Sequence, residues 1–356
     1  MEADNKRPDE VNVQQKLKAH PGQVAEDTSH ENIEVGRFRE LAFDAGKPLL
    51  LKGSQDGPSS MPAMGKWFQP VADSQNPPTA DTVSSYFQDF AMAPVPYELM
   101  YPQKREGGED VLGHFIKFLQ SSRLQSGSND TAEARLEQSL ASILNQHIQT
   151  APHGLGRPFI DPTRYQQLLR LDAPLALLIA ALRFNAQRQE SSRLRQLYIA
   201  QCSLSDLPPE LSEDLPVPRL IKEAGKGDIY ASSIWLGLEP TYTPLHRDPN
   251  PNLFVQLRSS KTVRLLPPQD GDAVFRHVQA ALGRRGGSSR IRGAEMMQGP
   301  EREMLHDAIW KTPRVPLQEA ELRPGDALFI PKGWWHGVKS RSDDGRLNGS
   351  VNWWFR

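Results

Sequence analysis

Six short apolar segments in the second half of the chain limit its fold more than any other feature. They are rich in β-branched and aromatic residues, and Pro, Gly, Asn or Asp separates them, as expected for strands joined by turns. Many short strands with such turns favour a sandwich or a jelly-roll barrel. We therefore predict an all-β core. The segments are residues 197–204, 228–238, 252–257, 261–268, 325–331 and 349–355.

The residues before these segments predict helices. Residues 33–46 indicate a helix that ends at Gly46, and residues 47–53 a short buried strand. Residues 105–196 predict a largely helical segment, because apolar residues recur at helical spacing. It contains two amphipathic stretches, around 110–124 and 132–144, and a third helical stretch over about 161–190.

The domain organisation follows from the same patterns. Residues 1–30 are polar and charged and predict a flexible tail. Residues 31–356 predict a single domain, in which residues 197–356 form the jelly-roll core with helical additions. An insertion at 269–320 interrupts this core and includes a basic, glycine- and serine-rich loop, GRRGGSSRIRG. We interpret that loop as a solvated surface segment.

Charge and cysteine content exclude several classes of protein. Lys and Arg number 42 against 43 Asp and Glu, so the net charge is −1 and nucleic acid is not an expected partner. The single cysteine, Cys202, rules out an internal disulfide framework. The N-terminus has no apolar leader, and the apolar run at 173–184 is too short to cross a bilayer. We expect a soluble protein of the cytosol or nucleus that does not bind membranes.

Three residues carry the strongest chemical signal. His246 and Asp248 are two positions apart, so they share one face of a strand, with Arg247 on the other face. His336 follows a Pro331-Lys-Gly turn in a second strand-like segment. Two histidines and one carboxylate make a facial triad, which leaves coordination positions of Fe(II) open. We therefore predict a metal site formed by His246, Asp248 and His336.

Longer motifs around these residues resemble a known family. They are TPLHRDPNPNLFVQLRSSK at 243–261, LLPP at 265–268, PGDALFIPKGWWH at 324–336 and SVNWWF at 350–355. Together they resemble the JmjC-domain (cupin-like) oxygenases that depend on Fe(II) and 2-oxoglutarate, and most closely the hydroxylase branch. The resemblance covers most of residues 33–356. It implies a double-stranded β-helix, that is, a jelly roll of the cupin type with N-terminal and inserted helices.

The resemblance also implies roles for residues near the triad, which would be the Fe(II) ligands. Lys261 matches the lysine that pairs with the distal carboxylate of 2-oxoglutarate, and a lysine ammonium suits that role. Thr243 matches a hydroxyl donor to the same carboxylate, and Tyr198 a tyrosine that lines its pocket. The remaining matches are Asn252 and Asn352, amides beside the metal and co-substrate, and Trp354, an aromatic wall.

One alternative concerns the co-substrate carboxylate. Many related oxygenases use an arginine about ten residues after the second histidine, and Arg346 occupies that position. We favour Lys261, because LNGSVN after Arg346 follows the JmjC pattern.

The resemblance implies an enzyme that hydroxylates a protein side chain and converts 2-oxoglutarate to succinate and CO₂, with no catalytic residue beyond the metal ligands. Other readings are an oxygenase of a small molecule or a tRNA base, a histone lysine demethylase, and a non-catalytic JmjC binding module. The triad and Lys261 together favour an enzyme over a binding module. A homodimer is an open alternative, since dimers are common in this family.

Overall fold

The computed structural model describes residues 21–53, 61–69, 83–101, 110–125, 131–150, 167–284, 297–313 and 315–356. Most of the predicted tail and of the basic loop at 283–293 lies outside the described residues.

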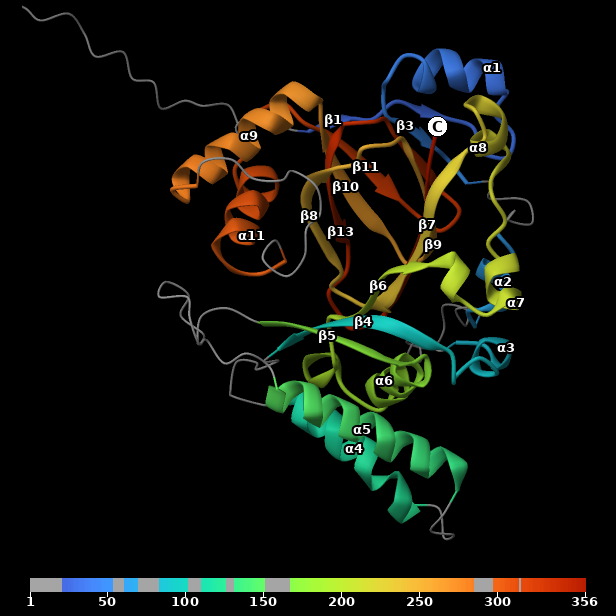
Figure 1. Cartoon of the computed structure of the whole chain (residues 1–356), viewed down its shortest axis with the longest axis vertical. Helices are drawn as coiled ribbons and strands as arrows, with labels where there is room; N and C mark the ends of the chain where they lie inside the picture. The colour runs from blue at the N-terminus through green and yellow to red at the C-terminus, as the bar shows by residue number, and fades with distance from the viewer. Residues whose placement is uncertain are drawn as a thin grey trace, which may run out of the picture.

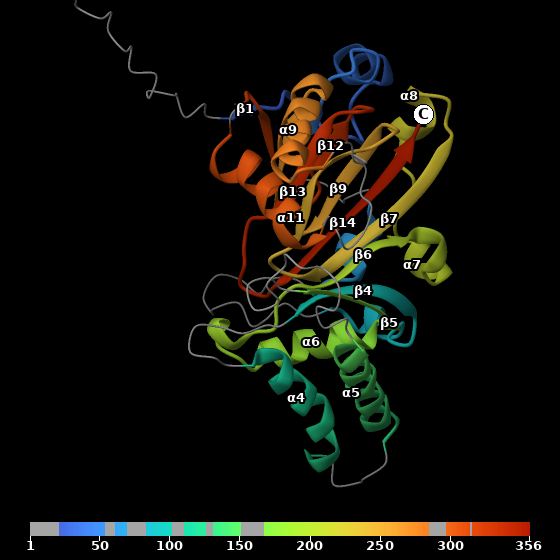
Figure 2. The same cartoon turned by 60° about the vertical axis from the view of Figure 1, so that its left-hand side comes forward.

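Two β-sheets form the core, as Figures 1 and 2 show. Apart from two short parallel pairs near the N-terminus, the described strands pair antiparallel. The prediction of an all-β, jelly-roll core with helical additions is confirmed. In sheet order, the five-stranded sheet contains β1 (Gly22–Gln23), β11 (Gln318–Leu322), β10 (Lys261–Leu266), β13 (Trp335–Ser340) and β8 (Tyr242–Arg247). The nine-stranded sheet contains β2 (Glu26–Asp27), β3 (Leu49–Leu51), β12 (Ala327–Ile330), β9 (Asn252–Arg258), β14 (Leu347–Phe355), β7 (Ile229–Leu238), β6 (Leu197–Ser203), β4 (Pro94–Tyr101) and β5 (Gln167–Pro174).

Alternating side chains fill the space between the sheets. On β10, Val263 and Leu265 pack in a buried cluster with residues of the opposite sheet, such as Phe254 and Leu328. Lys261 lies on the same face of β10 by this period of two and is 2 % exposed. The strand pattern therefore places a lysine inside the barrel, where an apolar residue would be the ordinary choice.

The inserted helices cover the outer face of the five-stranded sheet. They are α9 (Pro268–Ala281) and α11 (Gly299–His306), followed by a π-helical turn at Asp307–Lys311. Phe275 of α9 contacts Trp335 of β13, with ring centroids 5.2 Å apart. A Cβ at Gly271 would lie 2.1 Å from the Trp335 ring, so only glycine allows α9 to approach β13 this closely. Trp335, the residue before His336, is thus packed closely against helix α9.

Helices also cover the other parts of the nine-stranded sheet. Helices α4, α5 and α6 lie beneath β4 and β5 (Figure 1). They have the bounds Val111–Gln125, Ala132–Thr150 and Ala176–Ala186. Five shorter helices are also present among the described residues, namely α1 (Val35–Phe38), α2 (Pro62–Lys66), α3 (Ser85–Gln88), α7 (Pro209–Glu213) and α8 (Arg219–Ala224), with a π-helical turn at Arg39–Phe43. Short 3-10 turns span Glu190–Ser192 and Leu204–Asp206.

The predicted third helix at about 161–190 is wrong in its first part. Gln167–Pro174 forms strand β5, which pairs with β4 along eight residue pairs. Leu169, Leu171 and Ala173 are buried while Arg170 and Asp172 are exposed, which is a period of two rather than a helical period. The run of leucines and alanines that follows does form a helix as predicted, α6, and most of its residues are buried.

The two N-terminal predictions agree with the structure. The helical residues 35–43 end shortly before Gly46, whose φ of +59° suits glycine at a helix end. The buried strand is β3, which pairs with β12. None of the described helices is both long and apolar enough to cross a membrane.

Candidate metal centre

Strands β8 and β13 bring the two histidines of the predicted triad together. His246 is the direct partner of His336 in the antiparallel ladder, and their ring centroids are 4.2 Å apart. The predicted turn before His336 is present, because Trp334 N donates to Pro331 O at 3.2 Å and Gly333 has a φ of +78°. Gly333 N also donates to the Asp248 carbonyl at 3.1 Å. This turn therefore ties the third metal-ligand candidate to the first two.

A β-bulge in β8 explains how the side chain of Thr243 lines the same cavity as that of His246. Thr243 and His246 are three residues apart, which in a regular strand would place them on opposite faces. The register shifts here, so that Pro244 and Leu245 lie opposite the single residue Gly337. Proline is tolerated at such a bulge because it need not donate to the ladder. Thr243 and His246 consequently line the same cavity.

The ligand atoms of the triad converge. His246 Nε2 lies 3.8 Å from Asp248 Oδ1, and His336 Nε2 lies 3.6 Å from Asp248 Oδ2. Each histidine uses its other nitrogen, Nδ1, on a backbone carbonyl: that of Pro244 at 2.8 Å and that of Trp334 at 3.1 Å. A carbonyl accepts, so Nδ1 carries the proton and the Nε2 lone pair faces the centre.

The charges at the centre suit a divalent cation. Burial, helped by the neighbouring His336, lowers the pKa of His246 to about 4, so the ring is neutral and able to bind metal at pH 7. Burial opposes ionisation of Asp248, yet the two histidines and hydrogen bonds from Trp354 and Asn252 outweigh it and hold its pKa below the usual range. Two imidazoles and one carboxylate fit Fe(II) with open positions.

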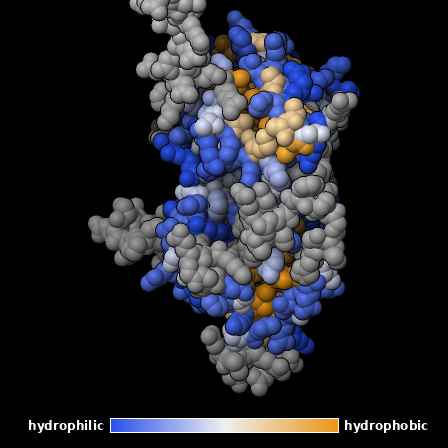
Figure 3. Space-filling view, turned by 90° about the vertical axis from the view of Figure 1, so that its left-hand side faces the viewer, coloured by the Kyte–Doolittle hydropathy of each residue, from blue (hydrophilic) through white to orange (hydrophobic). Residues whose placement is uncertain are grey.

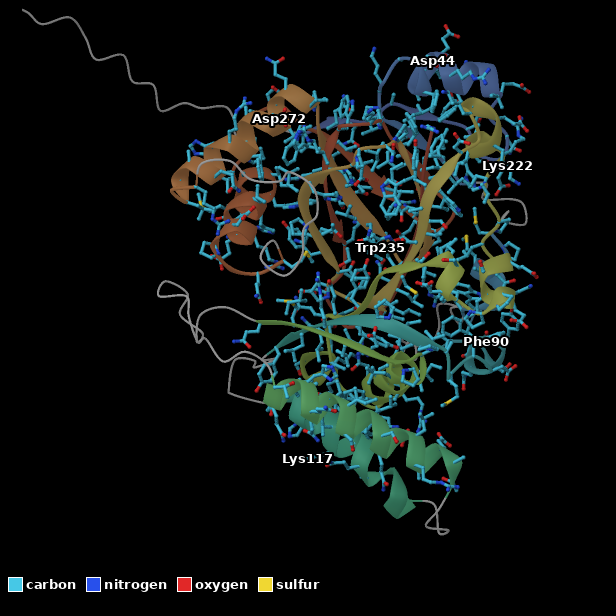
Figure 4. The ribbon with its side chains drawn as sticks, in the orientation of Figure 1. Asp44, Phe90, Lys117, Lys222, Trp235 and Asp272 are labelled. Carbon is cyan, nitrogen blue, oxygen red and sulfur yellow. The ribbon has the colours of Figure 1, made fainter. Side chains whose placement is uncertain are left out.

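A chain of hydrogen bonds orients Asp248. Its Oδ2 accepts from Trp354 Nε1 at 2.7 Å and from Asn252 Nδ2 at 3.1 Å. Asn352 Nδ2 donates to Asn252 Oδ1 at 3.0 Å, and Trp235 Nε1 donates to Asn352 Oδ1 at 2.8 Å. Asn252 and Asn352 lie on the neighbouring strands β9 and β14, and Figure 4 labels Trp235 near the centre of the molecule. Three of the residues predicted to bind co-substrate thus also contact the carboxylate of the triad, directly or through one amide.

Lys261 reaches the same cavity from β10. Its ammonium donates to Ser350 Oγ at 2.7 Å and to Tyr198 Oη at 3.3 Å. Burial lowers the pKa of Lys261 to about 7, and the charge of Glu239 opposes this shift only in part. Within the part of the chain that the structure describes, the ammonium forms no ion pair with a carboxylate. It is therefore a buried cation that a ligand carboxylate would complement.

One cavity of about 280 Å³ contains the whole arrangement. The predicted metal ligands and all six predicted co-substrate residues line it, namely Tyr198, Thr243, His246, Asp248, Asn252, Lys261, His336, Asn352 and Trp354. Whether the six bind a co-substrate stays a prediction. Sequence reasoning missed Ser350 and Trp235, which contact Lys261 and Asn352. Ser350 lies two residues before Asn352 on β14, so period-two alternation of that strand could have indicated it.

The alternative residue, Arg346, does not reach this cavity. Its guanidinium is paired with Asp344 Oδ2, and its side chain is 41 % exposed. The structure therefore favours Lys261 as the cation available to a ligand carboxylate. Arg247 Nη1 lies 3.0 Å from Asp272 Oδ1 on α9, and Arg247 also lines the metal cavity.

Replacing Trp354 by phenylalanine is expected to weaken metal binding about 10-fold, because hydrogen bonds to a metal-ligating group typically change affinity 10- to 100-fold. The ring remains as a cavity wall, whereas the hydrogen bond to Asp248 Oδ2 is lost. Titration of the protein with Mn²⁺ by calorimetry measures the effect. Trp353→Phe is the matched control, since Trp353 is buried in the apolar core. Equal affinities for Trp354→Phe and the unaltered protein would contradict the positioning role.

Comparison with known proteins agrees with this geometry. The chain is 31% identical to lysine-specific demethylase 8 of Danio rerio over 160 residues, which cover 44% of this chain and 36% of that protein. It is 32% identical to Jumonji C domain-containing protein 5 of Drosophila melanogaster over 160 residues, with 44% and 36% coverage. It is 29% identical to lysine-specific demethylase JMJ30 of Arabidopsis thaliana over 166 residues, with 47% and 35% coverage.

The chain matches only about a third of the length of these relatives. The match to a family is far more extensive, because the sequence model of the cupin-like domain covers residues 38–356. That range includes both sheets of the jelly roll from β3 onward, the triad and Lys261. On this match and the likeness to Jumonji C proteins, the chain belongs to the cupin-like domain family, in its JmjC form.

Proposed function

We propose that the protein is an Fe(II)- and 2-oxoglutarate-dependent oxygenase that hydroxylates a carbon of a protein side chain. One observation carries the proposal: the His246–Asp248–His336 cluster opens into the same cavity as a buried lysine that no described carboxylate neutralises. A triad alone would serve many metal proteins, whereas a triad with a cation set apart from it suits a co-substrate that has two separated acidic ends.

The residues of the cavity would have two different roles, metal binding and co-substrate binding. His246, Asp248 and His336 would hold the metal, and Lys261, Thr243 and Tyr198 would hold the distal carboxylate of 2-oxoglutarate. When bound, the iron supplies the oxidising chemistry, in which O₂ and 2-oxoglutarate yield CO₂, succinate and one oxygen atom for a substrate C–H bond. Trp354 and Asn252 keep Asp248 oriented through their hydrogen bonds. The buried apolar side chains of Phe254 and Val338 line the same cavity and would limit the access of water to the co-substrate.

A macromolecular substrate is supported by the shape of the surroundings. The metal cavity lies beside a larger cavity of about 650 Å³, and the two share Tyr198, Gln201 and Trp235. Side chains that can hydrogen-bond to a peptide backbone line the larger cavity, among them Gln201, Ser203 and Ser232.

The names of two relatives support a second candidate. Lysine-specific demethylase 8 of Danio rerio and JMJ30 of Arabidopsis thaliana are named as demethylases. Hydroxylation of an N-methyl carbon gives a product that releases formaldehyde, so the same site could remove a methyl group. The two outcomes differ in mass, since hydroxylation adds one oxygen and demethylation removes one CH₂.

A mass-spectrometric comparison of lysates tests the proposed reaction. Lysate proteins treated with the enzyme, Fe(II) and 2-oxoglutarate are expected to contain peptides that carry one added oxygen on a specific residue. The same peptides should be unmodified after treatment with His246→Ala. Peptides that lose a methyl group from lysine in place of gaining oxygen would favour the demethylase. Identical peptide masses with both proteins would refute a protein substrate.

A further inference from the structure

A series of neighbouring cavities, which we call the groove, runs from the metal cavity to a second, cationic pocket, and each cavity shares lining residues with the next. The metal cavity shares Tyr198 with the 650 Å³ cavity, which in turn shares Tyr242 and Met297 with a small connecting space. That space shares Tyr242 and Arg302 with a further cavity of about 390 Å³. We name this last cavity the cationic pocket and define it by Tyr242, Arg302, His306, Lys311 and Lys339.

The two ends of the groove lie on opposite faces of one strand pair. In the ladder between β8 and β13, Thr243 pairs with Val338, and both line the metal cavity. The adjacent pair, Tyr242 with Lys339, lines the cationic pocket. Neighbouring residues of a strand point to opposite faces. Since β8 is the last strand of its sheet, a bound chain could pass around this edge from one pocket to the other.

Charged groups in the cationic pocket are arranged to receive an anion. Arg302 lies over the Tyr242 ring, 4.8 Å from its centroid, and Lys339 lies 5.9 Å from the centroid of Trp310. Among the residues that the structure describes, neither cation forms an ion pair with a carboxylate. Asp307 is instead paired with Lys311 at 2.9 Å and contacts His306 at 3.3 Å. Glu303 also lines the pocket. Since Asp307 is already paired, the two cations Arg302 and Lys339 face one further carboxylate, and the pocket keeps an excess of positive charge.

The pKa of His306 depends on its burial and on the charged groups around it. Burial lowers the pKa of His306, and the charges of Lys339 and Arg302 lower it further, against the opposing effect of Asp307. The histidine is therefore neutral at pH 7 and does not compete with Arg302 and Lys339 for an anion. A carboxylate bound here would gain charge-assisted hydrogen bonds from Arg302 without displacing an existing partner.

The middle of the groove argues for a peptide over a nucleic acid. Glu98 and Asp172 line the 650 Å³ cavity, and its arginine, Arg170, already donates to Glu98 Oε1 at 3.0 and 3.1 Å. A nucleic-acid backbone carries one negative charge per residue, so these carboxylates would repel it. A peptide with a single acidic side chain meets no such repulsion. Figure 3 views the molecule from the side of α9 and α11, where much of the described surface is hydrophilic.

We propose that the cationic pocket binds an acidic side chain of a peptide substrate, at a fixed distance along the chain from the residue that enters the metal cavity. This proposal rests on the proposed function only in assigning the substrate to the metal cavity. The recognition of an acidic side chain by Arg302 and Lys339 does not require turnover, so the two can be tested apart.

The test is affinity selection from a random synthetic octapeptide library on the immobilised full chain. We expect the retained peptides to be enriched in Asp or Glu at one position, and the enrichment to fall about 10-fold in the Arg302→Gln/Lys339→Gln variant, the equivalent of one good charge contact. Arg341→Gln is the matched control, because Arg341 is exposed, pairs with Glu321 and is absent from the groove lining. Thermal melting checks that all variants are folded.

Two further measurements distinguish the proposal for the cationic pocket from the proposed function. His246→Ala should lose succinate formation and keep the acidic preference, whereas the double variant should keep succinate formation from 2-oxoglutarate alone. An acidic preference without succinate formation by the unaltered protein would support the pocket and refute the proposed function. No acidic enrichment, or enrichment that persists in the double variant, would overturn the pocket. Retention of random single-stranded RNA that depends on Arg302 would overturn the peptide assignment.

Discussion

Lys261→Met is expected to weaken binding of 2-oxoglutarate by about 100-fold or more, and also to raise the stability of the folded protein. Both effects have the same cause. The Lys261 ammonium is 2 % exposed, donates only to the Ser350 and Tyr198 hydroxyls, and has no described carboxylate partner. Truncating one partner of a buried charge pair costs about 2–5 kcal/mol of binding. Methionine fills a similar volume without burying an uncompensated charge.

The pH dependence of that stabilisation has a defined sign. The pKa of Lys261 is about 7 in the folded protein, below its ordinary value of 10.5, because burial disfavours the charged form. The unfolded chain therefore binds more protons between these values, so the cost of Lys261 is fully present below pH 7 and declines as pH rises. Lys261→Met should gain most stability, on the order of 1–3 kcal/mol, at or below pH 7 and little near pH 10.

Calorimetric titration with 2-oxoglutarate and thermal melting at several pH values measure the two effects. Lys222→Met is the matched control, because Lys222 lies on the surface helix α8, away from the barrel interior (Figure 4). Unchanged co-substrate affinity in Lys261→Met, or a loss of stability at pH 7, would contradict the assignment. If Arg346→Met lowered the affinity instead, the cation would have been misassigned.

The second large effect is expected for Asp248→Ala, which should lose metal binding by more than about 100-fold. Removing a metal ligand should lower metal affinity by more than the 10- to 100-fold that is typical when a hydrogen-bonding partner of the ligand is removed. Asp248 lies within 4 Å of both histidines through its two oxygens, so its removal also leaves Trp354 and Asn252 without their acceptor. Titration with Mn²⁺ measures the loss. Asp272→Ala is the control, since Asp272 pairs with Arg247 outside the triad. Comparable metal affinity in Asp248→Ala and Asp272→Ala would exclude Asp248 as a ligand.

The ligand candidates could be found from sequence because their signal is local. His246 and Asp248 need only strand periodicity, and the turn before His336 is indicated by Pro331 and Gly333. The short strands and their turn residues likewise indicated the jelly roll. Lys261 could be assigned only through family resemblance, because a lysine that begins a strand is ordinarily exposed. The structure adds that this lysine follows the inward face of β10.

Other features depend on pairings between distant segments. The bulge that turns Thr243 and His246 to one side requires the register of β8 against β13. The hydrogen bond between Asn252 and Asn352 requires β9 beside β14, and strand β5 exists because β4 pairs with it. The groove to Arg302 depends on even more segments that are distant in sequence, because residues from both sheets and from helix α11 line it.

The central claim is that the triad and Lys261 form a site for Fe(II) and 2-oxoglutarate. Its most direct measurement is succinate formation from 2-oxoglutarate by the purified chain, with and without Fe(II), beside Asp248→Ala. We predict succinate only when Fe(II) and the unaltered triad are both present. Succinate formation that persists without Fe(II), or at the same rate in Asp248→Ala, would contradict the claim.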